Sequence, residues 1–148
     1  MSGWKVVSDQ KSDAGAWVIS DADGNETDSG TDGLASLASK FVENQVQFAA
    51  IRVCGVDEQE NVTSTRPKIV RINWVGKKVP AMKKMSALQG KQKMSDLWNG
   101  CAVEVEANTQ DDLTMKAVGV ELLRCGGAHK PTHYDFGDDK IPLSDCKN

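Results

Sequence analysis

VQFAAIRVC (residues 46–54) and KIVRINWV (residues 68–75) are the two stretches of this sequence that decide its fold. Both are nearly apolar on both faces, which is typical of central strands covered by helices on each side. The polar segment 55–66 between them is long for a hairpin loop but short enough to join paired strands. Arg71 is the exception in the second stretch, and we expect its charge to reach a sheet rim, a carboxylate or solvent.

The N-terminal part predicts a hairpin followed by a helix. Residues 16–20 (AWVIS) form a strand candidate, which the turn signal DADGN at 21–25 closes, and a short return strand is expected after Asn25. An amphipathic helix is then predicted from apolar residues spaced at i, i+3, i+4, i+7 and i+8: Leu34, Leu37, Ala38, Phe41 and Val42.

The C-terminal half predicts two helices and a strand. Pro80 fits the first turn of a helix. We expect this helix to bury an apolar stripe and to kink or break near Gly90; the stripe comprises Met82, Met85, Leu88, Met94, Leu97 and Trp98. Residues 101–107 (CAVEVEA) predict a strand with one wet face near a sheet edge. Thr109 and Asp112 form a capping-box variant that should open a last helix, which the Gly126-Gly127 pair ends.

These elements together predict an α/β or α+β fold with a central mixed sheet sandwiched by helices. At 148 residues the chain is expected to be one domain. Residues 129–148 are polar and contain two prolines, so we expect a weakly ordered tail. No apolar run reaches the length of a membrane span, and the N-terminus has no secretory-type hydrophobic region, so we expect a cytoplasmic protein.

The charge pattern divides the chain into three parts. Residues 1–60 carry four basic and eleven acidic groups, and residues 96–148 carry five and ten. Residues 61–95 contain no acidic residue and nine basic ones: Arg66, Lys68, Arg71, Lys77, Lys78, Lys83, Lys84, Lys91 and Lys93. Such a segment on an acidic body would steer an acidic partner to one face. The alternative is a solvated face that only maintains solubility.

The sequence offers few groups for catalysis or metal binding. His129 and His133 are its only histidines, and Pro131 between them prevents a regular helix. We therefore expect no metal, no cofactor and no enzymatic activity, and we interpret Glu104 and Glu106 as solvated surface rather than as an acid–base pair. Of the cysteines, Cys54 and Cys101 should be small core residues, and Cys125 and Cys146 the more exposed thiols.

The basic segment is a plausible platform for an acidic surface. Lys83, Lys84 and Lys91 fall on the helix predicted after Pro80, Lys77 precedes it, and Arg66 and Lys68 open the strand before it. An acidic protein and an anionic lipid headgroup both remain open as partners. Nucleic acid is not expected, because the segment lacks exposed aromatic residues and the whole chain is acidic.

Three stretches resemble coactosins, members of the actin-depolymerising-factor/cofilin homology family. They are Trp17-Val18 with Asp23-Gly24, the strand KIVRINWVG at 68–76, and the ending ELLRCGGA at 121–128. The resemblance runs from about Ala16 to Ala128 and implies a domain at residues 1–128, with 129–148 as a tail. It also implies a non-enzymatic cytoplasmic protein of the cytoskeleton, monomeric, that binds the side of actin filaments without strong severing.

The resemblance also implies particular binding residues. The filament-binding lysine of the family falls on Lys68, a basic residue early in the long helix on Lys84, and a basic residue linked to partner binding on Arg124. Arg71 replaces a typically aliphatic residue, and the segment before the first turn is shorter than in relatives. The expected actin-binding set is therefore Lys68, Lys84, Arg66, Lys77, Lys83, Lys91 and Arg124. The alternative is an anionic-lipid (phosphoinositide) or protein adaptor module that uses the same basic face.

Overall fold

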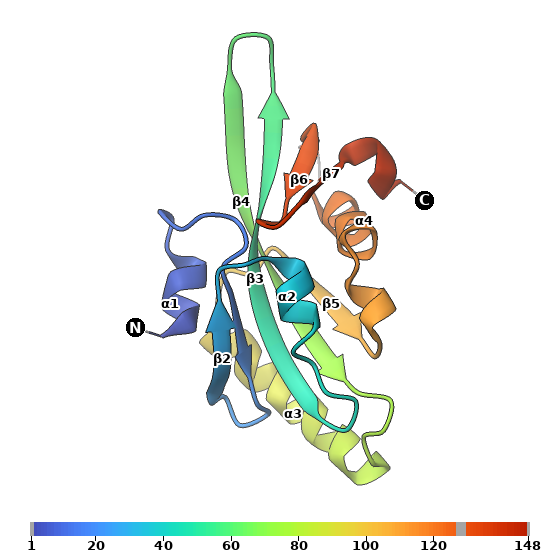
Figure 1. Cartoon of the computed structure of the whole chain (residues 1–148). Coiled ribbons are helices and arrows are strands. Elements are labelled where there is room, and N and C mark those ends of the chain that lie inside the picture. Colours follow the sequence, from blue (N-terminus) through green and yellow to red (C-terminus); the bar gives the residue numbers. More distant parts are fainter. Residues whose placement is uncertain (1, 127–129, 148) are drawn as a thin grey trace.

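The computed structural model describes residues 2–126 and 130–147 (Figure 1). In this part of the chain the main sheet has the strand order β2-β1-β3-β4-β5, and all its pairs are antiparallel except the parallel pair β4–β5. Two short strands join it, because β6 pairs with β3 and β7 with β6. The strands are β1 (Trp17–Ser20), β2 (Glu26–Gly30), β3 (Val46–Glu58), β4 (Thr63–Val75), β5 (Val103–Ala107), β6 (His133–Asp135) and β7 (Lys140–Pro142).

Helices cover both faces of this mixed sheet, which confirms the predicted fold class. α1 and α3 pack on the face that carries Phe48 and Ala50, with Met94 and Trp98 in the same buried cluster. α2 and α4 cover the other face, where the larger core contains Ile51 of β3. The helices are α1 (Gly3–Ser8), α2 (Leu34–Ala38), α3 (Ala81–Leu97) and α4 (Met115–Cys125), with 3-10 turns η1 (Gln110–Leu113) and η2 (Leu143–Cys146).

β3 and β4 extend beyond the body of the molecule as a two-stranded arm (Figure 1). Their register is continuous from Val46 opposite Val75 to Glu58 opposite Thr63, so the predicted loop at 55–66 is wrong. The connection is a short turn in which the N–H of Gln59 donates to the carbonyl of Val62. The ladder continues because polar side chains can be solvated on both faces once the strands leave the core.

α3 is one unbroken helix, so the predicted kink or break near Gly90 is wrong. Gly90 instead allows the helix to lie close to the sheet, since a Cβ there would stand 2.8 Å from Cε2 of Phe48. The predicted apolar stripe is also only partly buried. Met94 and Trp98 face the sheet, but the other four members point away from it and are exposed: Met82, Met85, Leu88 and Leu97.

Local signals correctly predicted the start of α2 but neither its end nor the start of α4. α2 ends at Ala38, so Phe41 and Val42 lie outside it. The capping box of Thr109 and Asp112 is present, but it opens η1, and α4 begins after its own cap at Thr114. β5 lies at the sheet edge and alternates in burial, as predicted.

The expectation of a weakly ordered C-terminal tail is wrong for residues 130–147. Four side chains of this segment are buried in the larger core: Tyr134, Phe136, Ile141 and Cys146. Cys146, predicted to be exposed, leaves no room for a Cβ at Gly119, which would stand 2.5 Å from its Sγ. The carboxylate of Asp138 accepts hydrogen bonds from the N–H groups of Leu34 and Ala35 at the start of α2. Tyr134 and Phe136 are two residues apart, as in a strand, but one such pair is shorter than the roughly four to eight residues over which alternation predicts a strand. These apolar residues nevertheless fill one side of the core.

Candidate functional site

Lys68 and Arg66 lie on β4 at the base of the arm. Side chains of a strand alternate between faces, so both residues project on the face that buries Val70 and Ile72 and that α4 covers. Lys68 is half-buried and Arg66 is exposed. We call this pair the arm-base surface.

Arg124 lies in the last turn of α4, on the same face of the sheet as the arm-base surface. Its guanidinium is exposed and forms an ion pair with Glu121, one turn earlier on the helix. Part of the charge of Arg124 is therefore compensated within α4, and an acidic partner would have to compete with Glu121 for it.

A second surface lies on the opposite face of the sheet, along the outer side of α3. Met82, Met85 and Leu88 are 87%, 75% and 71% exposed and follow one another at three-residue spacing. Lys84 is exposed beside them, and these four residues form what we call the α3 ridge. Lys83 is also exposed, but it lies seven residues before Gly90, on the same side of the helix, and it lines a hollow with Asp21 and Asp23 next to the ridge. Lys77, exposed in the turn between β4 and α3, precedes the ridge.

Lys91, by contrast, is already paired within the protein. Its Nζ lies 2.5 Å from Glu106 and 3.1 Å from Glu104, and these contacts raise the pKa of Lys91. Glu104 also forms an ion pair with the buried Arg71 and accepts a hydrogen bond from Asn73 at 2.7 Å. Glu106 is exposed, as the sequence predicts, whereas Glu104 is only one-third exposed and not simply solvated. Both glutamates join α3 to the edge of the sheet.

The network sets the protonation of Glu104. Partial burial raises the pKa of its carboxyl, but the hydrogen bond from Lys91 and the charge of Arg71 outweigh burial and hold that pKa below its usual value of 4.5. Arg71 thus reaches a carboxylate, one of the three outcomes that the sequence left open.

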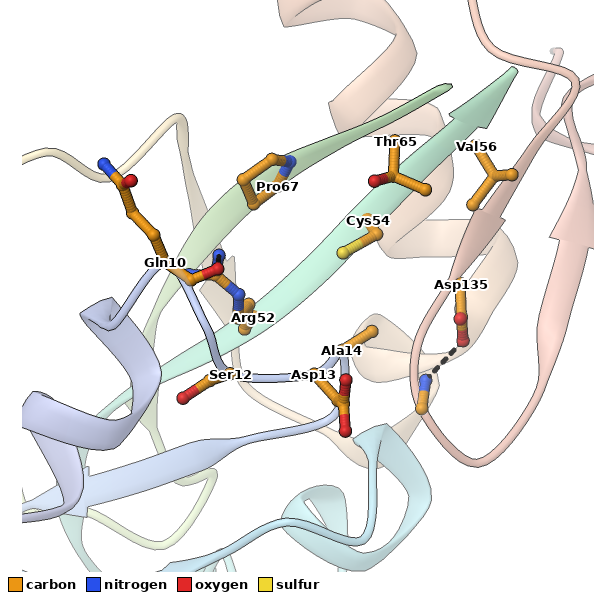
Figure 2. A pocket seen from close by; sticks show the side chains of 11 residues that line it. Gln10, Ser12, Asp13, Ala14, Arg52, Cys54, Val56, Thr65, Pro67 and Asp135 are labelled. Carbon is orange, nitrogen blue, oxygen red and sulfur yellow. Dashed lines mark hydrogen bonds between the residues drawn. The ribbon is translucent and has the colours of Figure 1, made fainter. Parts of the chain in front are cut away.

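A hollow of about 390 Å³ lies where the segment after α1 meets the arm base and β6. Figure 2 shows the side chains that line it. The guanidinium of Arg52 donates to the carbonyls of Val7 and Gln10, so it secures this segment. Burial raises the pKa of the Cys54 thiol, and the carboxylates of Asp135 and Asp13 raise it further against the lowering effect of Arg52. The thiol therefore stays protonated at neutral pH and is a poor nucleophile.

Within the described residues, no group of three His, Cys, Asp or Glu side chains has metal-binding geometry. His129 lies outside the described residues, and Nδ1 of His133 lies 3.6 Å from Glu58. No described helix is both long and apolar enough to cross a membrane.

Residues 4–122 match the sequence model of the cofilin/tropomyosin-type actin-binding proteins. The chain belongs to the cofilin/ADF family. The match covers strands β1 to β5, α3 and most of α4, and thus the arm-base surface and the α3 ridge but not Arg124. It stops before the C-terminal segment 130–147, which in this cofilin/ADF-family protein completes the core.

Among the relatives and solved structures to which this chain is similar are coactosins. Coactosin of Entamoeba histolytica is 32% identical over 67% of this chain and 65% of that protein. Drebrin-like protein A of Xenopus laevis is 24% identical over 89% of this chain but only 29% of that protein, so this chain spans less than a third of it. The crystal structure of Entamoeba histolytica coactosin superposes with a TM-score of 0.69 at 22% identity, covering 86% of this chain and 93% of that one. The coactosin resemblance in the sequence is thereby confirmed.

The fold divides the predicted site of this cofilin/ADF-family protein into separate parts. Arg66 and Lys68 lie on one face of the sheet, Lys83 and Lys84 on the other, and Lys91 is engaged by two glutamates. The sequence pattern does not reveal the exposed methionines of the α3 ridge, because their spacing predicts a buried stripe. Their spacing from Gly90 and Met94 could have predicted this exposure. At 100° per residue, Met82, Met85 and Leu88 point away from those two residues, which face the sheet.

Proposed function

We propose that this protein binds the side of actin filaments through the arm-base surface and the α3 ridge, without enzymatic activity and without strong severing. Its membership of a family of actin-binding proteins supports actin as the partner. Mouse coactosin, whose structure resembles this one, is described as an actin filament binding protein, which supports the filament, rather than the actin monomer, as the form bound.

The α3 ridge is the observation that carries the proposal. Met82, Met85 and Leu88 are each more than two-thirds exposed, and contiguous exposed apolar side chains commonly mark a docking surface. Methionine side chains adapt to an irregular partner surface. Lys83 and Lys84 beside them would add electrostatic attraction, so the complementary site on the partner would be an apolar cleft with an acidic rim.

The arm-base surface supports a polymeric partner. Lys68 and Lys84 project from opposite faces of the sheet, so a flat partner surface could not contact both. A filament presents repeated copies of one subunit, so one copy could receive the α3 ridge and a neighbouring copy the arm base. Lys77 would extend the basic contact with the subunit that binds the α3 ridge. Arg66 and Arg124 would extend the contact with the subunit that binds the arm base.

Co-sedimentation with filamentous actin tests the proposal, at low salt and at physiological salt. The wild type should pellet with filaments, and less at the higher salt because exposed ion pairs are screened. Lys68→Ala and Met85→Ser should each weaken pelleting. Lys40→Ala, which removes an exposed lysine distant in sequence from both surfaces, should not. A wild type that stays in the supernatant at both salt concentrations would exclude filament binding.

The exposed methionines and lysines of α3 also favour a second candidate function, binding to anionic lipid. A helix with exposed apolar residues and flanking lysines can lie on an acidic membrane surface. Flotation with liposomes that contain a phosphoinositide, compared with neutral liposomes, separates the two candidates. Flotation that requires the anionic lipid and is lost with Lys84→Ala would support lipid binding.

A further inference from the structure

Ser86 of α3 follows two lysines directly, in the sequence Lys83-Lys84-Met85-Ser86. No other serine or threonine in the sequence has Lys or Arg at both the third and the second position before it. Paired basic residues at these positions form a charge pattern that basophilic protein kinases can select. We propose that Ser86 is a phosphorylation site for a basophilic serine/threonine kinase, and that phosphate there weakens binding through the α3 ridge. The second half of this proposal rests on the proposed function.

The start of α3 is accessible enough to serve as a kinase substrate. Every residue from 81 to 86 is exposed, and the first buried position of the helix is Gly90. Pro80 at the N-cap supplies no side-chain hydrogen bond to the helix. These turns are therefore held mainly by backbone hydrogen bonds, and such helix ends open at low free-energy cost. A kinase could bind residues 83–86 in the extended conformation during such an opening.

The surroundings of Ser86 leave room for a phosphate. Its Oγ donates a hydrogen bond to the carbonyl of Lys83 at 2.6 Å and is not bound in the core. It borders an open hollow of about 360 Å³, which Lys83, Asp21 and Asp23 also line. A phosphoryl group could thus replace the hydroxyl proton without displacing buried side chains.

The chemistry is an ordinary phosphoryl transfer from ATP. The Oγ of Ser86 forms a bond to the γ-phosphorus, and the bond from that phosphorus to the β,γ-bridging oxygen breaks. ADP leaves, and the hydroxyl proton passes to the catalytic base of the kinase. The product carries about −1.5 to −2 charges at neutral pH. That charge would cancel the attraction that Lys83 and Lys84 offer to an acidic rim.

The effect on binding follows from this reversal of local charge. An acidic partner would lose two attractive contacts, so filament affinity should fall roughly fivefold, or about 1 kcal/mol. The new charge would also lie beside Asp21 and Asp23, and this repulsion would favour opening of the first turns of α3. The arm-base surface should be unaffected.

The test incubates the full chain with ATP and the catalytic subunit of cAMP-dependent protein kinase, a basophilic enzyme used as the probe. Mass spectrometry should locate one phosphate on Ser86. Ser86→Ala should abolish it, and Ser95→Ala, at a half-buried serine of the same helix, should not. Failure of the kinase to modify Ser86 in the folded chain would overturn the assignment.

Co-sedimentation then compares the phosphorylated and unmodified proteins with Ser86→Glu and its uncharged control Ser86→Gln. Phosphorylated protein and Ser86→Glu should bind filaments about fivefold more weakly, and Ser86→Gln should bind like the wild type. Equal affinity of all four forms would overturn the regulatory part of the proposal. The kinase assay contains no actin, so an unmodified protein that failed to bind filaments would refute the proposed function and not the phosphorylation site.

Discussion

Lys68 and Lys84 lie on opposite faces of the sheet, although both come from the same basic segment of the sequence. Lys68 shares the face of Val70 and Ile72 on β4, whereas Lys84 belongs to α3, which packs on Phe48. A segment that reads as one charge cluster in sequence thus provides two separate surfaces in space. Because the two lysines share no contacts, their contributions to binding should be independent.

This independence gives the first prediction. Lys68→Ala and Lys84→Ala should each weaken filament binding by about 0.5–1 kcal/mol, and the double variant by about the sum. Binding curves from co-sedimentation at one fixed salt concentration measure the three values, with Lys40→Ala as the control. A double variant no weaker than either single variant would mean that the two lysines do not contribute independently.

Glu104 is predicted to matter for stability rather than for binding. Glu104→Ala would leave the buried Arg71 without its carboxylate and should lower the free energy of unfolding by about 2–3 kcal/mol, less than for a fully buried pair because the Glu104 side chain is one-third exposed. Urea unfolding measures the loss. Glu43→Ala is the control, since it breaks an exposed pair with Lys78 and should cost less than about 1 kcal/mol.

The same carboxyl predicts a dependence of stability on pH. The pKa of Glu104 is lower in the folded than in the unfolded protein, so its contribution is complete above the unfolded value of 4.5 and is lost as the pH falls through the folded value. The difference in unfolding free energy between the wild type and Glu104→Gln should therefore be constant from pH 7 to 5 and shrink below about pH 4.5. A difference that stayed constant into the acid range would show that the charge of Glu104 is not the source.

Gly90 is predicted to be required for the packing of α3. Alanine favours a helix by about 1 kcal/mol over glycine, but a Cβ here would stand 2.8 Å from the ring of Phe48. The clash should outweigh the gain, so Gly90→Ala should lower stability by about 1 kcal/mol net. Thermal unfolding compared with Gln89→Ala, at the exposed neighbouring position, checks this result. A stabilised Gly90→Ala variant would contradict the close contact with the sheet.

The C-terminal segment is predicted to be essential for folding. Phe136→Ala would leave a cavity in the larger core and should cost about 3–5 kcal/mol. Ser144→Ala, at an exposed position of the same segment, should cost almost nothing. Chemical denaturation measures the free energy of unfolding of both variants. A negligible effect of Phe136→Ala would mean that residues 130–147 are a weakly ordered tail after all, as the composition indicated.

The sequence by itself determined the elements that depend on local periodicity. The apolar stretches at 46–54 and 68–75 became the central strands, the alternation at 101–107 became an edge strand, and the capping box at Thr109 formed a helical turn. These patterns are local, because the period of apolar residues reports directly which side of an element can be buried.

Tertiary structure decided what local periodicity leaves open. α3 has apolar residues on two faces. The face with Gly90 and Met94 packs on the sheet because Gly90 permits close approach, so Met82, Met85 and Leu88 on the other face are exposed. The buried residues of segment 130–147 form runs too short to predict a strand, and their order depends on packing against the larger core. The basic residues lie on two faces because strand alternation places Lys68 on one side of the sheet, while α3 packs against the other and carries Lys84 there. Counting charges along the sequence cannot show this separation.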